Sequence, residues 1–137
     1  MNSLIEELKG DHARMLAHLD EVRKLGIGSK DGRAKLMNVK GTLLGHLKKE
    51  DVRLYPSLHE AAKTNAELKS LLDRFAKDME EVSRSALAFF DKYAQGGDPI
   101  EFGRDYGKLS VTLNNRMRRE ETTLYPEFEK LGMKKSA

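Results

Sequence analysis

The sequence predicts an all-α fold, an antiparallel up-down-up-down four-helix bundle. Apolar residues recur at helical spacing through most of the 137 residues. Turn-forming residues interrupt this pattern at Gly26–Gly32, at Thr64–Asn65 and at Gly96–Pro99. Four long helices with short connections pack most simply as neighbours that run in alternating directions. We therefore expect residues 1–137 to form a single domain, long enough to bury a core without covalent cross-links.

The first two predicted helices lie on either side of the turn at Gly26–Gly32. Their apolar stripes contain Ile5, Leu8, Leu16, Leu19 and Val22, and then Leu36, Val39, Leu43 and Leu54. Ionisable side chains share these stripes, with His12 in the first helix and His46 and Glu50 in the second. These three residues are therefore predicted to face the interior of the bundle.

The third predicted helix extends from about Ala66 to Ala94, and the fourth begins at Asp98, an N-cap followed by Pro99 in the first turn. Their stripes contain Leu72, Phe75, Met79, Val82, Ala86, Phe89, Phe90 and Tyr93, and then Tyr106, Leu109, Leu113, Arg116, Glu120 and Leu124. The fourth helix is thus predicted to carry an arginine and a glutamate into the interior.

One segment occurs twice, in two different forms. Residues 46–56 read HLKKEDVRLYP, and residues 116–126 read RMRREETTLYP. A histidine and a glutamate four positions apart lie on one helix face, about 6 Å apart along the axis, and can hold a metal ion together. The second copy keeps the glutamate, Glu120, but has Arg116 in place of the histidine.

Proline closes both copies of this segment, at Pro56 and Pro126. Because proline lacks a backbone donor and clashes with the preceding turn, the second and fourth helices are predicted to end or kink near Leu-Tyr-Pro. The bundle would then consist of two related helical hairpins.

Composition limits both the metal chemistry and the partners. Cysteine is absent, so a metal would be held by nitrogen and oxygen ligands, which favours iron, manganese or zinc. The 25 basic and 22 acidic residues are interleaved, with a net charge of +3, which indicates solvated helix faces and no nucleic-acid partner. The chain has no long apolar run and no signal-like N-terminus, so we expect a soluble, cytoplasmic protein without a membrane partner.

The two interior glutamates are the strongest indication of a site. Burying a carboxylate costs several kcal/mol unless it is paired, hydrogen-bonded or bound to a cation. Glu50 and Glu120 therefore both require a partner in the interior.

The residues that carry this chemistry resemble the hemerythrin-like (HHE, cation-binding) family over nearly the whole chain. The resemblance rests on Asp11-His12, on His46-xxx-Glu50-Asp51 followed by Leu54-Tyr55-Pro56, and on Glu120-Glu121 followed by Leu124-Tyr125-Pro126. It implies a four-helix bundle around a non-haem di-iron centre. One histidine comes from each of the first and third helices, a His-xxx-Glu pair comes from each of the second and fourth, and the two glutamates bridge the metals.

The resemblance assigns His12, His46, Glu50 and Glu120 to metal-ligand positions. Two expected histidines are replaced: Arg116 stands at one position, and alignment of Asp78-Met79 with Asp11-His12 places Met79 at the other. Both replacements would affect the same iron, so one metal half-site is predicted to be lost.

Arg116 and Met79 are expected to fill the space of the missing metal half-site in different ways. We infer that the Arg116 guanidinium stands where the second cation would be, paired with Glu50 and Glu120. The thioether of Met79 is a poor ligand for a hard cation and is expected to fill core volume. Two states remain open: a single iron held by two histidines and two glutamates, or a metal-free, salt-bridged core.

These residues favour a metal-binding protein that binds or senses oxygen, nitric oxide or iron, with at most one ion. The alternative is a degenerate metal-free bundle that serves as a structural or protein-interaction module. No nucleophile elbow or phosphate-binding loop is present, so no catalytic residue is assigned and binding is favoured over enzyme activity. Partners would be a small diatomic ligand or a metal ion, and a homo-oligomer or protein partner stays open. His18 is expected to lie outside the site, and His59 near an end of the bundle.

Overall fold

The computed structural model describes residues 3–136, with side chains described for residues 4–131. The long helices are α1 (Ser3–Leu25), α2 (Lys30–Lys49), α4 (Ala66–Tyr93) and α5 (Pro99–Arg119), and two shorter helices are α3 (Tyr55–Ala62) and α6 (Tyr125–Ser136). Two π-helical turns, η1 (Glu50–Leu54) and η2 (Glu120–Leu124), join α2 to α3 and α5 to α6.

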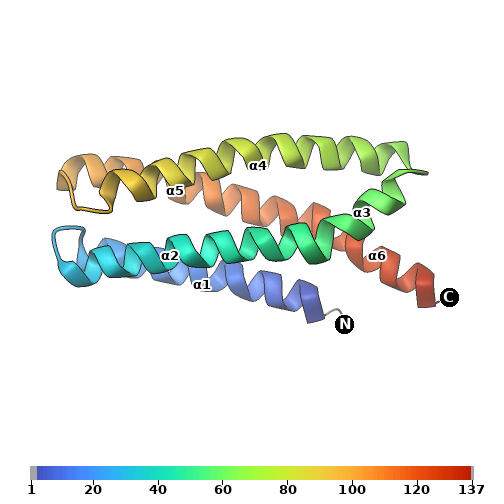
Figure 1. Cartoon of the computed structure of the whole chain (residues 1–137), viewed down its shortest axis with the longest axis horizontal. Helices are drawn as coiled ribbons and strands as arrows, with labels where there is room; N and C mark the ends of the chain where they lie inside the picture. The colour runs from blue at the N-terminus through green and yellow to red at the C-terminus, as the bar shows by residue number, and fades with distance from the viewer. Residues whose placement is uncertain (1–2, 137) are drawn as a thin grey trace.

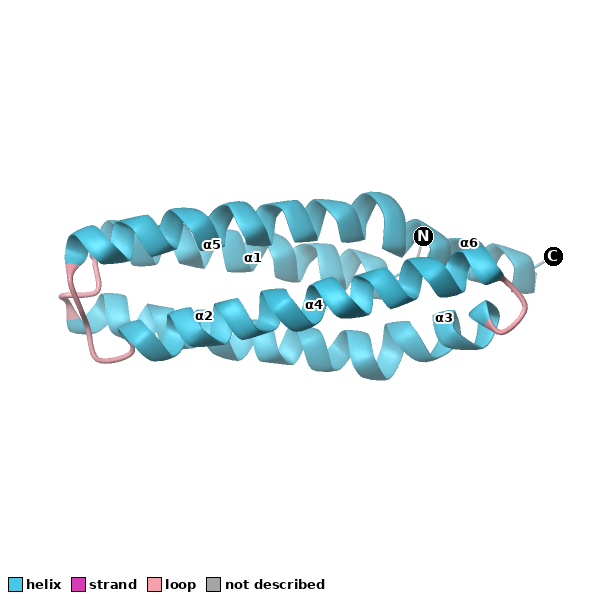
Figure 2. Cartoon of the chain, turned by 90° about the horizontal axis from the view of Figure 1, so that it is seen from above, coloured by secondary structure: helices cyan, strands magenta, loops and turns pink. Residues whose placement is uncertain are grey.

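The helices pack as the predicted all-α bundle, so this expectation is confirmed. α1 packs against α2 and α5, and α4 packs against α5 and α2. The α1–α2 and α4–α5 loops lie together at one end of the bundle, and both chain termini lie toward the other end (Figures 1 and 2). At that second end α3 and α6 are in contact, which places the two copies of the duplicated segment side by side.

Helix starts follow the local sequence. The Ser29 side chain caps α2 by accepting a hydrogen bond from the Gly32 N–H at 2.9 Å. A side chain at Gly32 would meet the Gly26 carbonyl oxygen at 1.9 Å, so only glycine fits there. Asp98 caps α5, as predicted, by accepting from the Ile100 N–H at 2.9 Å.

Each duplicated segment contains a π turn, which the sequence did not predict. Regular α-helix stops at Lys49 and Arg119, but the chain continues as helix through η1 and η2 into α3 and α6. The Tyr55 and Tyr125 N–H groups bond to carbonyls five residues back instead of four. The predicted end of regular α-helix near each proline is therefore confirmed, and a wider π turn just before each ring carries the chain into a short further helix.

Both π turns begin at an interior glutamate, Glu50 in η1 and Glu120 in η2. A π turn inserts one extra residue per turn and so changes the direction in which the side chains at its start point. The local irregularity therefore lies at the two positions where the sequence predicts metal-binding carboxylates.

A layer of buried polar side chains divides the core, and we call it the polar layer; it contains Asp11, His12, His46, Glu50, Arg116 and Glu120. On the loop side lies an apolar cluster that includes Met15, Leu19, Val22, Leu36, Leu43, Phe90, Tyr93, Phe102, Leu113 and Met117. On the terminal side lies a second cluster that includes Ile5, Leu8, Leu54, Leu58, Leu72, Phe75, Leu124 and Tyr125. Apolar side chains thus separate the polar layer from both ends of the bundle.

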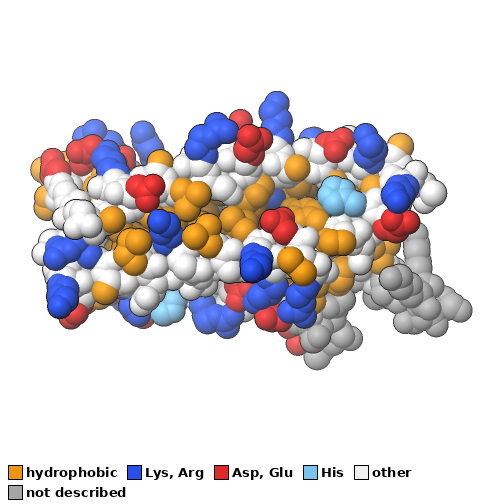
Figure 3. Space-filling view, in the orientation of Figure 1, with side chains coloured by type: hydrophobic (Ala, Val, Ile, Leu, Met, Phe, Trp, Pro, Cys, Tyr) orange, Lys and Arg blue, Asp and Glu red, His pale blue; other side chains and the backbone are white. Residues whose placement is uncertain are grey.

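The surface agrees with the charge pattern of the sequence. Basic and acidic side chains are interspersed over the face shown in Figure 3, with apolar side chains between the helices. Within residues 3–136, no helix combines the length and the hydropathy that are needed to cross a membrane.

Candidate metal centre

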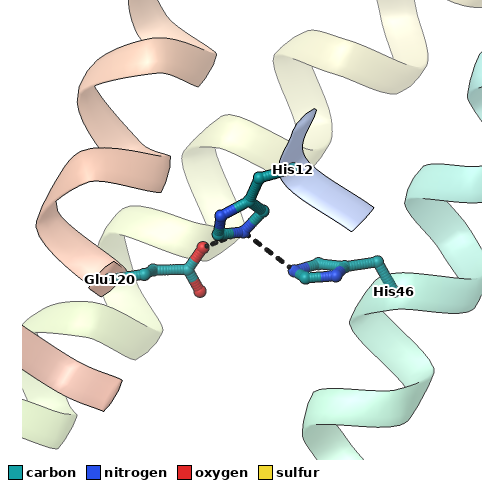
Figure 4. A group of neighbouring side chains, drawn as sticks. All are labelled: His12, His46 and Glu120. Carbon is teal, nitrogen blue, oxygen red and sulfur yellow. Dashed lines mark hydrogen bonds and ion pairs between the residues drawn. The ribbon is translucent and has the colours of Figure 1, made fainter. Parts of the chain in front are cut away.

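Four predicted ligand residues from three long stretches of helix meet in the polar layer. His12 comes from α1, His46 from the last turn of α2, and Glu50 and Glu120 from the first positions of η1 and η2. The ligand atoms of His12, His46 and Glu120 all lie within 4.8 Å of one another (Figure 4). Glu50 joins them through its Oε2, which lies 3.6 Å from Nε2 of His46.

The two imidazole rings point their Nε2 atoms at each other. These atoms are 3.1 Å apart, and Nε2 of His12 is also 3.2 Å from Oε1 of Glu120 (Figure 4). Both histidines are almost completely buried, with 2% and 3% of their surface exposed. The arrangement directs two nitrogen lone pairs and a carboxylate into one small, dry volume.

The opposite ring nitrogens are each held by a carboxylate. Nδ1 of His46 lies 3.0 Å from Oδ2 of Asp11, and Nδ1 of His12 lies 2.8 Å from Oε2 of Glu121. Because an ionised carboxylate only accepts hydrogen bonds, the proton is assigned to Nδ1 in both rings. Nε2 is then left as the unprotonated atom, which is the form that binds metal in carboxylate–histidine–metal arrangements.

Asp11 is itself fixed by basic neighbours. Lys49 donates to Oδ2 of Asp11 at 2.9 Å, and Arg14 donates to its other oxygen. Burial alone would raise the pKa of Asp11, but the hydrogen bonds from His46, Lys49 and Arg14 outweigh burial and hold the pKa below its usual value of 3.8. Asp11 therefore stays ionised as the acceptor for His46.

The carboxylates of Glu50 and Glu120 are only partly satisfied by protein groups. The Tyr125 hydroxyl donates to Oε2 of Glu50 at 3.0 Å and lies 3.2 Å from Nε2 of His12. The other oxygens, Oε1 of Glu50 and Oε2 of Glu120, are buried and have no hydrogen-bond partner among the described residues. Unpartnered carboxylate oxygens in the interior are the acceptors that a cation would satisfy.

The two carboxylates affect each other's protonation. Burial raises the pKa of Glu120 to about 7, opposed by the hydrogen bond with His12 and reinforced by the charge of Glu50. Burial also acts to raise the pKa of Glu50, but hydrogen bonds with His46, Glu120 and Tyr125 outweigh it and lower that pKa. Without a cation, the pair is thus best described as one carboxylate at Glu50 and one shared proton at Glu120.

Arg116 enters the interior as predicted but does not make the predicted ion pair. It is 3% exposed, and its Nε and both Nη atoms have no hydrogen-bond partner within the described part of the chain. Its guanidinium carbon lies 4.5 Å from the centre of the Phe75 ring. The inferred pairing with Glu50 and Glu120 is wrong at the level of direct contact, because the guanidinium stacks on an aromatic face instead.

Met79 is partly buried, and its sulfur accepts a hydrogen bond from the Ser83 hydroxyl at 3.3 Å. It lines a cavity of about 20 Å³ together with Arg116 and with His12, His46 and Glu120. Met79, Arg116 and three of the predicted ligand residues therefore surround the same small space.

A repeated ion pair supports the alignment of Met79 with His12. In the first half of the chain Lys49 bonds to Asp11, which precedes His12, and in the second half Arg119 bonds to Asp78, which precedes Met79. Lys49 and Arg119 occupy the same position in the two copies of the duplicated segment.

Sequence reasoning missed three contributors to the site: Asp11, Glu121 and Tyr125. The signal was available for the two acids, because each directly neighbours a predicted ligand in the sequence. Tyr125 was assigned no role from the sequence, whereas its hydroxyl reaches both Glu50 and His12.

The two remaining histidines lie outside the centre. His18 is half-buried and contacts Lys35 at 3.3 Å, and His59 is exposed beside the ring of Tyr55. His18 thus lies outside the centre, as expected, and His59 lies in α3 at one end of the bundle.

The donor set fits a cation of the borderline-to-hard class. Two imidazole nitrogens and carboxylate oxygens, with no sulfur ligand, suit iron, manganese or zinc. His12, His46 and Glu120 would hold the ion, and Glu50 is the nearest further carboxylate. The Nδ1 partners and the unpartnered carboxylate oxygens are the two observations on which this fit rests.

Comparisons with known proteins bear on the family. Searches of curated proteins and of solved structures returned no match. The family model described as the hemerythrin HHE cation binding domain matches residues 3–128, which include every residue of the polar layer. The chain therefore belongs to the hemerythrin HHE cation-binding family.

Proposed function

We propose that this protein binds one iron ion through His12, His46, Glu50 and Glu120. The observation that carries this proposal is the orientation of the two imidazoles, whose Nδ1 atoms bond to Asp11 and Glu121 and whose Nε2 atoms meet beside Glu120. A core histidine that served packing alone would have no need to direct its Nε2 atom at a second imidazole and a buried carboxylate.

A single ion is favoured because the second half of the centre lacks ligands. Arg116 cannot lose its proton to bind a metal, and a thioether such as Met79 is a weak ligand for a hard cation beside carboxylates. Both side chains line the cavity next to the retained ligands. The family's cation-binding role would thus be kept in a reduced form.

Binding or sensing of a small molecule, or of iron itself, is the role that this site suits best. A bound iron would supply a coordination position or a redox change to a diatomic ligand such as oxygen or nitric oxide. The chain's own part is to surround the centre with apolar side chains, with Met15, Leu43 and Leu113 on the cavity wall, and to hold the Glu50 carboxylate through the Tyr125 hydroxyl. No described group is arranged as a nucleophile with a base, so we propose a binding protein and not an enzyme.

A metal-free bundle with a structural or protein-interaction role is the second candidate. Burial acts to lower the pKa of His46, but hydrogen bonds and charge from Glu50 and Asp11 outweigh it and raise the pKa. A protonated His46 would then balance the charge of Glu50 without any ion. This is the one observation that favours the metal-free candidate.

Elemental analysis separates the two candidates. Protein produced with added iron should retain about one metal ion per chain after dialysis. His46→Ala should lose the metal, because the substitution removes one imidazole from the ligand set. The matched control His18→Ala, on the same helix as His12 but outside the centre, should keep it. A wild-type protein that holds no metal under these conditions would rule out the first candidate in favour of the second.

A further inference from the structure

The unpartnered groups of the centre are of two kinds, acceptors and donors. The acceptors are Oε1 of Glu50 and Oε2 of Glu120, which the proposed metal would satisfy. The remaining unpartnered buried side-chain atoms within the described residues are the Nε and both Nη atoms of Arg116 and the hydroxyl of Tyr55. The Arg116 nitrogens can only donate, and the Tyr55 hydroxyl can donate as well, so what the metal leaves unsatisfied is a need for an acceptor.

The Arg116 guanidinium lies over an aromatic ring. Phe75 lies against the guanidinium at 4.5 Å, and an aromatic ring attracts the flat face of a cation but accepts little from its N–H groups. The N–H groups of a guanidinium lie in its plane and form a rigid fork suited to anions. Arg116 is thus in contact with an aromatic ring, while its N–H groups have no hydrogen-bond partner among the described residues.

The cavity beside this guanidinium limits the size of an acceptor. It measures about 20 Å³ and is lined by Arg116, Met79, Ser83, His46 and Glu120, among others. A volume of this size holds about one water-sized group. The acceptor would be a single atom, or little more.

The charge of the guanidinium favours an anion over a neutral acceptor. Arg116 is always protonated, and within the described residues no carboxylate is hydrogen-bonded to it. Donor chemistry and cavity size therefore point to a small monovalent anion.

We propose that Arg116 binds one small monovalent anion beside the metal, in the space where the family's second metal ligands are replaced. The proposal rests on the proposed metal site, since the two glutamates would oppose an anion in its absence. Arg116 then serves as a binding residue and not as a permanent partner for the carboxylates.

An entry route for such an anion starts at the surface. Met79 and Ser83 line the interior cavity and also an outer groove of about 450 Å³ whose wall includes Tyr55 and His59. The unbranched side chain of Met79 changes rotamer readily. Its movement would connect the groove with the guanidinium.

Isothermal titration calorimetry with fluoride tests the proposal, because fluoride is a one-atom monovalent anion and a strong hydrogen-bond acceptor. Iron-loaded wild-type protein should bind one fluoride per chain. Arg116→Met should weaken this binding at least about tenfold, the effect of losing charge-assisted hydrogen bonds. Arg118→Met, which removes an exposed arginine from the same helix, should bind as the wild type does.

Metal content is measured on each sample before and after titration, so that loss of metal is never mistaken for loss of the anion site. A wild-type protein without metal contradicts the proposed function. A metal-loaded wild type that binds no fluoride, or a metal-loaded Arg116→Met variant that binds it equally well, contradicts the anion site alone. If Arg116→Met does not fold, Arg116→Lys keeps the charge but loses the fork, and it should bind fluoride more weakly than the wild type. Acetate is too large for the cavity, and equal binding of acetate would place the anion on the surface and refute the proposal.

Discussion

The two copies of the duplicated segment share a backbone but differ in their interior chemistry. Both begin a π turn at a glutamate, and both are tied to the preceding helix of their own half by an ion pair, Lys49 with Asp11 and Arg119 with Asp78. In the first copy His46 is bonded to a carboxylate, whereas in the second Arg116 stacks on an aromatic ring with its nitrogens unpartnered.

This difference shows that the scaffold and the ligand set are separable. The π turn follows from backbone hydrogen bonding and the downstream proline, which both copies retain. The residue one helical turn before each glutamate is an imidazole bonded to a carboxylate in the first copy and a guanidinium placed over the Phe75 ring in the second. One half of the centre could thus lose its metal chemistry without losing its fold.

The largest expected effect concerns the shared scaffold. Leu54 and Leu124 end the two π turns, and both are completely buried in the same apolar cluster. Leu54→Ala and Leu124→Ala should each lower the free energy of unfolding by about 3 kcal/mol, because each leaves a cavity in a packed core. Urea denaturation measures both, and a loss confined to one variant would contradict the equivalence of the two copies.

The second-largest expected effect is a difference in stability between variants of Asp11 and Asp78, the aspartates that precede His12 and Met79 in the sequence. Asp11 is buried and bonds to His46 and Lys49, whereas Asp78 is a third exposed and bonds to Arg119 at the surface. In metal-free protein at pH 7, Asp11→Asn should cost about 2 kcal/mol, and Asp78→Asn less than about 1 kcal/mol.

The pH dependence of Asp11→Asn follows from the lowered pKa of Asp11. A carboxyl whose pKa is lower in the folded state stabilises the protein above its usual value of 3.8, and this contribution is lost as the pH falls through the folded value. The difference in stability between wild type and Asp11→Asn should therefore shrink below pH 3.8. A difference that stays constant as the pH falls would mean that Asp11 is not held ionised by its neighbours.

The smallest effect compares the tyrosines that follow the two π turns. The Tyr125 hydroxyl bonds to Glu50, whereas the Tyr55 hydroxyl is buried without a partner in the described chain. In metal-free protein Tyr125→Phe should cost about 1 kcal/mol, and Tyr55→Phe should be neutral or slightly stabilising. Thermal denaturation of the two variants measures this, and the reverse order of stability would contradict the assigned hydrogen bonds.

The sequence predicts the fold well because the information is local and periodic. Apolar spacing identifies the four long helices, and turn residues separate them close to the observed boundaries. The same spacing correctly places His12, His46, Glu50, Arg116 and Glu120 in the interior.

Other features depend on three-dimensional contacts that periodicity cannot express. A proline in a helical pattern indicates a break, but whether a π turn relieves its clash depends on the packing of the residues around it. Opposite charges also predict a contact between Arg116 and the glutamates, whereas the position of Phe75 on α4 provides another place for the guanidinium. The carboxylates that hold the imidazoles were neighbours of the ligands in sequence, but which nitrogen each one reaches depends on how the helices pack.

The central claim is that one metal position is kept and the other is lost through Arg116 and Met79. Counting metal ions per chain in the wild type and in the double variant Met79→His with Arg116→His tests this most directly. The account predicts about one ion in the wild type and two in the double variant, whose new imidazoles would complete the second position. A wild type with no metal, or a folded double variant that holds no more metal than the wild type, would contradict it.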